Sequence, residues 1–181
     1  MSEYSRTVDA QTAVSKVRYG GYTSNLHLAL PLARNSVFVA ANGARLNDPS
    51  VTKLIVVITD HPSADHSATL REAELVRDAG IGVVTIGVGT DFNRYELSAI
   101  ASFPYTDNMF IVDTVRDLTV FTNRVKRIIC GGTLQGYASL GVMILARFLF
   151  INSVLRRYLS LCDAEVKFTN NLSNKSQQII I

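Results

Sequence analysis

The sequence is poor in cysteine, since Cys130 and Cys162 are the only two among its 181 residues. Two cysteines cannot build the disulfide framework of a small secreted scaffold, and no Cys-x-x-Cys pair is present to bind zinc. Whether the two pair with each other stays open. The chain also has little excess charge of either sign, because it contains 18 basic and 15 acidic residues and has no strong basic run. This balance gives no reason to expect a nucleic-acid partner.

Signals of catalysis, nucleotide binding and secretion are missing as well. The sequence has no phosphate-binding loop and no Gly-x-Ser-x-Gly elbow, and neither cysteine has a histidine near it. The glycines at 80–89 (GIGVVTIGVG) surround a predicted strand and do not open a helix, as a dinucleotide-binding loop would. The first ten residues are polar and lack the apolar core of a signal peptide. The protein is therefore either cytosolic, or the chain starts downstream of its true beginning.

What the chain does contain is an alternation of buried strands and amphipathic helices. Continuous apolar runs predict strands covered on both faces, at 53–59 (KLIVVIT), at 82–89 (GVVTIGVG) and around Met109–Val112. The spacing of apolar residues predicts helices at 23–41, 67–79, 94–101 and 114–129. Such alternation favours parallel β-α-β units. The predicted fold class is therefore α/β, a Rossmann-like, doubly wound and mainly parallel sheet.

Two residues mark special points of the predicted helices. Pro31 falls inside the 23–41 helix and removes a backbone donor, so we expect a kink or a weak turn there. Gly80 follows the 67–79 helix, at the position where a left-handed residue commonly ends a helix.

Asp60 and Thr23 are candidate ligands at one end of the sheet. Asp60 directly follows the 53–59 strand, and loops at the carboxyl ends of parallel strands converge on one crevice. Thr23 opens the preceding helix after Gly20-Gly21, so its hydroxyl could face the same crevice. A hard cation such as Mg²⁺ prefers oxygen ligands of this kind. The simpler interpretation is that Asp60 starts a turn and that Thr23, Ser24 or Asn25 caps the helix.

The loop after Asp60, HPSADHS, offers a second kind of metal site. His61, Asp65 and His66 are, with Asp60, residue types that bind transition metals. Pro62 makes their spacing irregular, and no helical His-x-x-x-His pair is present. This pattern favours a solvated loop.

Four segments follow one another in an order that is found in a known family. They are GGYTSNLHLALPLARNSVF at 20–38, KLIVVITD at 53–60, RDAGIGVVTIGVG at 77–89 and ELSAIASFP at 96–104. MFIVDTVRDL at 109–118 and the position of Cys130 also fit that order. The series, which covers roughly residues 4–130, resembles the von Willebrand factor type A domains of collagen VI-like and matrilin-like matrix proteins.

This resemblance implies a protein-binding module with a metal-ion-dependent adhesion site at the top of the sheet. Thr23 and Asp60 match a threonine and an aspartate of that site. The family's other three ligands come from a DxSxS motif after its first strand, which this sequence lacks, and His61 replaces the glycine that follows the aspartate. We therefore predict weak or absent binding of Mg²⁺ or Ca²⁺. The loop residues His61, Ser63 and Asp65 are expected to contact the partner.

The family's first strand also has no match in this sequence. In the family that strand lies beside the one that matches 53–59, and without it a long apolar strand would have an open edge that invites aggregation. The resemblance therefore implies a sheet that lacks its first strand, in a fragment whose N-terminal part, with any signal peptide, is missing. Related domains commonly pair a cysteine after the last helix with one before the first strand, and that partner position is absent for Cys130.

Two regions are expected, a partial type A domain at 1–130 and an atypical extension at 131–181. The extension contains a linker, an apolar segment at 137–155 and a polar tail. The apolar segment is near the lower length limit for a membrane span. Arg147 near its centre would cost roughly 2.5–3.5 kcal/mol in a bilayer, so a buried helix or unrelated appended sequence is preferred.

By resemblance, the protein is expected to be a non-catalytic adhesion module of the extracellular matrix or a cell surface. A metal-independent structural scaffold is one alternative. An intracellular nucleotide-binding α/β protein is another, and the missing phosphate loop argues against it.

Overall fold

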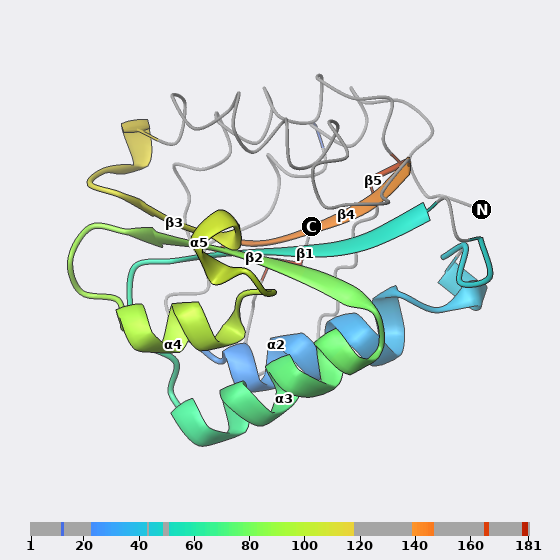
Figure 1. Ribbon diagram of the computed structural model, residues 1–181, viewed down its shortest axis with the longest axis horizontal. Coiled ribbons are helices and arrows are strands. Elements are labelled where there is room, and N and C mark those ends of the chain that lie inside the picture. The colour runs from blue at the N-terminus through green and yellow to red at the C-terminus, as the bar shows by residue number, and fades with distance from the viewer. Residues whose placement is uncertain are drawn as a thin grey trace.

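A computed structural model describes residues 12, 23–42, 44–48, 51–117, 139–146, 165–166 and 179–180 (Figure 1). Its helical elements are α2 (Leu26–Leu32), the π-helical turn η1 (Ala33–Val37), the 3-10 turn η2 (Ala40–Asn42), α3 (His66–Asp78), α4 (Arg94–Ile100), α5 (Tyr105–Asn108) and the 3-10 turn η3 (Val115–Asp117). Its strands are β1 (Val51–Thr59), β2 (Ile81–Val88), β3 (Met109–Val112), β4 (Ser139–Ala146), β5 (Glu165–Val166) and β6 (Ile179–Ile180). Most of the helix predicted at 114–129 lies outside the described residues, as do both cysteines.

The strands form one sheet in the order β3-β2-β1-β4-β5, with β6 paired to β4. β1 runs parallel to both β2 and β4, β2 runs parallel to β3, and β4 runs parallel to β5. Among the described strands, the short β6 alone is antiparallel to its neighbour. The predicted α/β class and the mainly parallel sheet are confirmed. The strand order reverses between β1 and β4, and at such a point the loops leaving the carboxyl ends of an open α/β sheet make room for a ligand.

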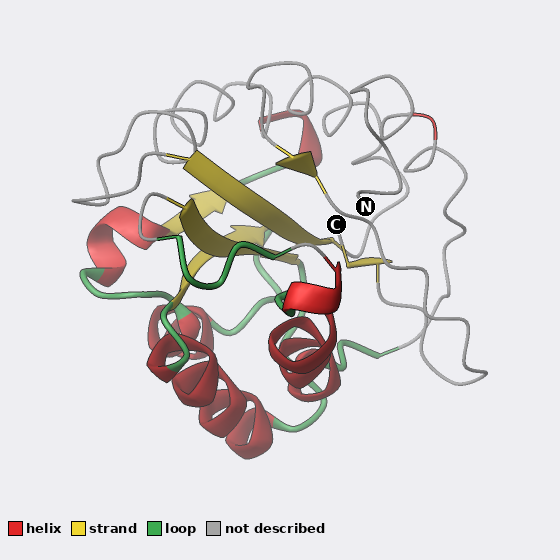
Figure 2. Ribbon diagram, turned by 90° about the vertical axis from the view of Figure 1, so that its right-hand side faces the viewer, coloured by secondary structure: helices red, strands yellow, loops and turns green. Residues whose placement is uncertain are grey.

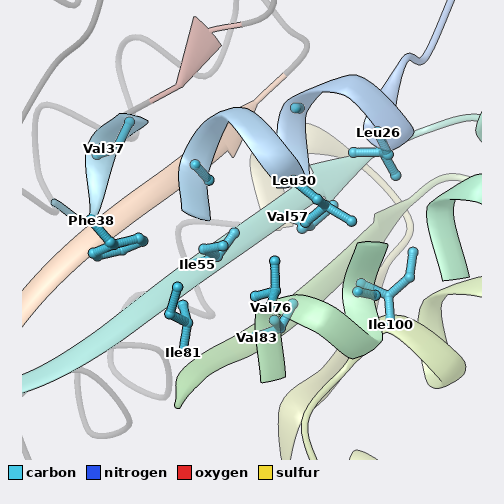
Figure 3. Packing of buried hydrophobic residues seen from close by; sticks show 13 residues of the cluster. Leu26, Leu30, Val37, Phe38, Ile55, Val57, Val76, Ile81, Val83 and Ile100 are labelled. Carbon is cyan, nitrogen blue, oxygen red and sulfur yellow. The ribbon is translucent and has the colours of Figure 1, made fainter. Parts of the chain in front are cut away.

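β1 is buried on both of its faces, as its continuous apolar sequence predicts. Ile55 and Val57 are 0% exposed and share a core cluster with Leu30 of α2 and Val76 of α3 (Figure 3). Figure 2 shows these helices together on one face of the sheet. Leu54, which alternates with Ile55 and so points to the opposite face, is also 0% exposed. A strand buried in this way fixes the position of the residue that follows it.

The first helix loses its regular geometry just after Pro31, where a weak turn was predicted. A proline at this position has no N–H to donate to the preceding turn. The helix then widens into the π-helical turn η1, in which the Phe38 N–H donates to the Ala33 carbonyl at 3.0 Å. Arg34 of this turn forms an ion pair with Glu72 of α3 at 3.0 Å. The predicted 23–41 helix is therefore three shorter elements, of which α2 and η1 contact α3.

β4 occupies the position beside β1 that the family resemblance leaves without a strand. Val51–Ile58 of β1 pair in register with Ser139–Ala146 of β4. The helical and membrane-spanning alternatives for 137–155 are therefore wrong for residues 139–146, while the rest of that segment lies outside the described residues. In the part of the chain that the structure describes, no helix is long and apolar enough to cross a membrane. A segment of the predicted extension thus joins the same sheet as the strands before residue 130.

The glycines on either side of β2 allow backbone conformations that other residues rarely adopt, in agreement with the prediction of a helix end, a strand and a tight turn. Gly80 follows Ala79, the C-cap of α3, with a φ of +68°, and its N–H donates to the Arg77 carbonyl at 2.9 Å. Gly89 has a φ of +78° at the first position after β2. Both angles are in the left-handed region that favours glycine. One glycine ends a helix before β2 and the other forms a tight turn after it. A dinucleotide-binding loop would instead lead from a strand directly into a helix.

Candidate functional site

Asp60 lies at the carboxyl end of β1, with its side chain 21% exposed. The turn that follows is closed by Thr59, a buried residue whose hydroxyl donates to the His61 carbonyl at 2.8 Å and accepts the His61 N–H at 3.3 Å. This pair of hydrogen bonds fixes the direction in which the chain leaves the sheet. The carboxylate of Asp60 is therefore held at the end of a rigid strand, as predicted.

His61 stands where the family pattern has a glycine, and the structure accommodates it. No described residue other than glycine has a positive φ, so His61 enters the turn without left-handed strain. Its side chain is 50% exposed, and its Nδ1 atom lies 2.9 Å from Oδ1 of Asp60. The replacement therefore adds an imidazole next to the candidate carboxylate ligand.

Thr23 lies at the same end of the sheet as the loop that follows Asp60. The Ala64 N–H donates to the carbonyl of Ser24 at 2.7 Å, which joins the loop after β1 to the residue next to Thr23. Thr23 is exposed, and its hydroxyl donates to Oδ1 of Asn25 at 3.3 Å. The N-cap position of α2 belongs to Asn25, so the structure does not support Thr23 as the helix cap.

Glu96 of α4 is a buried carboxylate that holds the loop after β1, and sequence reasoning missed it. The residue is 0% exposed. Its Oε2 atom accepts the Ser63 N–H at 2.9 Å, and its Oε1 atom accepts the Ser63 hydroxyl and lies 3.0 Å from Nδ1 of His66. A signal was available, because Glu96 precedes Ile100 by four residues and so shares the buried face of its helix.

The predicted partner-contact residues have different environments. His61 and Asp65 are exposed, whereas Ser63 is half-buried and its hydroxyl is bonded to Glu96. Asp65 is also the N-cap of α3, where its carboxylate accepts the Ala68 N–H at 2.9 Å. Asp65 therefore has a structural role in addition to the predicted contact, and Ser63 faces the interior with its polar atom.

The described residues provide only part of a cation site. Asp60 offers a carboxylate and Thr23 a hydroxyl, which are hard oxygen donors suited to Mg²⁺ or Ca²⁺. Among the described residues, no group of three or more histidine, cysteine, aspartate or glutamate side chains is placed to hold a metal ion. The two histidines of the loop lie beside different carboxylates, His61 beside Asp60 and His66 beside Glu96. This separation favours the solvated-loop interpretation over a transition-metal site.

Comparison with known proteins places this arrangement in a family. The sequence model of the von Willebrand factor type A domain matches residues 1–124. The chain belongs to the von Willebrand factor type A domain family. Type A relatives include matrilin-2 of Mus musculus, which is 30% identical over 131 residues, a stretch that covers 72% of this chain and 13% of matrilin-2.

Solved type A structures agree with this assignment. Proximal thread matrix protein 1 from the mussel byssus has a TM-score of 0.61 and 28% sequence identity, covering 71% of this chain and 30% of the mussel protein. The form of that protein with a zinc-occupied MIDAS motif, the metal-ion-dependent adhesion site, has a TM-score of 0.60 and 29% identity over the same shares. The chain thus spans less than a third of either relative, each of which is a larger protein.

Proposed function

We propose that this type A domain is a protein-binding module of an extracellular matrix or cell-surface protein, without catalytic activity. Its binding surface is the end of the sheet where β1 stops. The observation that carries the proposal is the hydrogen bond from the Ala64 N–H to the Ser24 carbonyl. It holds the loop that follows partly exposed Asp60 next to the segment that contains exposed Thr23. Matrilin-2 and the mussel byssus protein, both similar to this chain, support a matrix location.

In this proposal Asp60 and Thr23 are the remnant of the adhesion site, and His61 and Asp65 add contacts from the exposed loop. A cation bound by one carboxylate and one hydroxyl keeps most of its water, so its affinity is low. Ser63 contributes by shaping the loop from inside, since its hydroxyl is bonded to Glu96. We expect calorimetric titration of the full chain with Mg²⁺ or Ca²⁺ to give no dissociation constant in the low micromolar range.

A metal-independent scaffold is the second candidate, and one observation favours it. His61 Nδ1 lies 2.9 Å from Oδ1 of Asp60, so a cation at that oxygen would have to compete with the imidazole. In this alternative the same surface binds its partner through the exposed loop, and the chelator has no effect on binding.

Binding of the full chain to a surface coated with decellularised extracellular matrix distinguishes the candidates. We expect Asp60→Ala to reduce binding at least about tenfold, which is the loss of roughly one charge-assisted contact. Asp78→Ala is the matched control, because Asp78 is an exposed aspartate at the far end of α3. Binding that is lost in EDTA supports the metal-assisted form, and binding that resists EDTA supports the scaffold. Equal binding by wild type and Asp60→Ala would refute the metal-assisted form.

A further inference from the structure

The buried carboxylate of Glu96 is not explained by the stability of its own helix. Asn93 caps α4, with its side chain accepting the N–H groups of Tyr95 and Glu96 at 3.0 and 3.1 Å. A glutamate three residues after an N-cap commonly reaches back to the cap's own N–H. Here the carboxylate instead turns into the protein and bonds the loop after β1. A shorter apolar side chain would fill the helix face without the cost of burying a charge.

Among the described residues, this carboxylate is bonded by Ser63 of the loop after β1 and by His66, the first residue of α3. Ser63 donates both its N–H and its hydroxyl, and His66 lies 3.0 Å away through Nδ1. Opening the loop would leave a carboxylate that is 0% exposed without these partners. Because an unsatisfied buried charge is costly, the closed loop is strongly preferred over open alternatives.

The same loop carries the candidate binding residues on its outer side. Asp60 and His61 precede Ser63, and Asp65 follows it before α3 begins. The Ala64 N–H also donates to the Ser24 carbonyl at 2.7 Å. The loop is therefore held by Glu96 through Ser63 and by Ser24 through Ala64. An anchor at Ser63 therefore determines how the residues on either side of it are presented.

We propose that Glu96 is the positioning residue of this binding surface: it sets the conformation of loop 60–66 without touching the partner. The proposal rests on the proposed function for its binding consequence, while its effect on the loop stands alone. It makes a distant helix part of the binding site, because a change in α4 would alter the presentation of Asp60 and Asp65.

Amide hydrogen exchange on the full chain measures the effect on the loop. We expect Glu96→Ala to speed exchange at Ser63 and its neighbours by about tenfold to a hundredfold, the range set by losing hydrogen bonds to a charged group. Amides of β1 and β2 should keep their protection. Glu96→Gln retains an acceptor oxygen, so it should keep part of the protection at Ser63 that Glu96→Ala loses. Unchanged loop exchange in Glu96→Ala would overturn the proposal, as would equal acceleration throughout the sheet.

Two further variants keep the test decisive. Ser63→Ala removes the hydroxyl from the loop side without emptying the core, and serves if Glu96→Ala fails to fold; it should speed loop exchange as well. Glu74→Gln, an exposed change on α3, should leave exchange as in wild type. Matrix binding is measured in parallel. A wild type that does not bind refutes the proposed function alone, whereas normal binding by Glu96→Ala with an accelerated loop refutes the positioning role.

Discussion

Gly87 of β2 lies where a side chain would collide with an aromatic ring. It pairs in register with Thr59, the residue before Asp60, so it is close to the binding end of the sheet. A Cβ added at Gly87 would lie 2.7 Å from both Cε2 and Cζ of Phe92, in the loop after β2. Real Cβ contacts essentially never approach so closely. Gly87→Ala must therefore displace the Phe92 ring.

The cost follows from two opposing effects. Overpacking of this kind destabilises by about 1–3 kcal/mol. Replacing glycine in a strand returns about 0.5–1 kcal/mol, because the unfolded chain loses conformational freedom. Phe92 is half-buried and can swing partly outward, which favours the lower part of the range. We expect a net loss of about 0–1.5 kcal/mol in the free energy of unfolding, or up to roughly 6 °C in Tm for a chain of this size.

Urea unfolding followed by far-UV circular dichroism measures this loss, and suits a chain that contains no tryptophan. The decisive comparison is the double-mutant cycle with Phe92→Ala, in which Gly87→Ala should no longer destabilise and should gain up to about 1 kcal/mol. Gly82→Ala is a milder control, since its Cβ would meet the tip of Leu54 at 3.1 Å and the Lys53 carbonyl at an ordinary contact distance of 3.6 Å. If Gly87→Ala costs the same with and without the Phe92 ring, the collision is not the reason for the glycine.

Two other predictions concern the core and the sheet. Leu30→Ala should cost about 2–5 kcal/mol, because Leu30 is 0% exposed beneath β1, whereas Leu28→Ala, at a site 53% exposed, should stay within about 0.5 kcal/mol in the same urea assay. In a cysteine-free background, Thr52→Cys with Leu140→Cys should form an intramolecular disulfide on a non-reducing gel, because the two residues are register partners and adjacent strands lie about 4.8 Å apart. Thr52→Cys with Gly141→Cys, one residue out of register, should not cross-link. A disulfide between two molecules would assign β4 to the sheet of another copy.

Much of the fold follows from local sequence patterns. The apolar run from Lys53 to Thr59 and the helix stop at Gly80 predict β1 and the end of α3 within two residues, because burial on both faces and a left-handed glycine leave direct marks in sequence. The same holds for Asp60, whose place at the end of a buried strand was predictable. These features depend only on neighbouring residues.

The features that sequence reasoning missed depend on distant residues. The segment 139–146 is as apolar as a buried helix, and only its pairing with β1 distinguishes it as a strand. Glu96 has the spacing of a helix-capping residue, and nothing local shows that its carboxylate turns toward Ser63, 33 positions earlier. A weak turn was predicted after Pro31, but the proline alone did not predict its π-helical form.

The pairing of β1 with β4 has a consequence for how the protein folds. Lys53 meets Ile81 in β2, only 28 positions later, while Val51 meets Ser139 in β4, 88 positions later. The longer closure adds only about 1 kcal/mol of chain entropy, but contacts of high sequence separation form late. We expect the β1–β2–β3 unit to assemble first during synthesis. Until residues 139–146 emerge from the ribosome, one side of β1 is then exposed to chaperones and to other nascent chains.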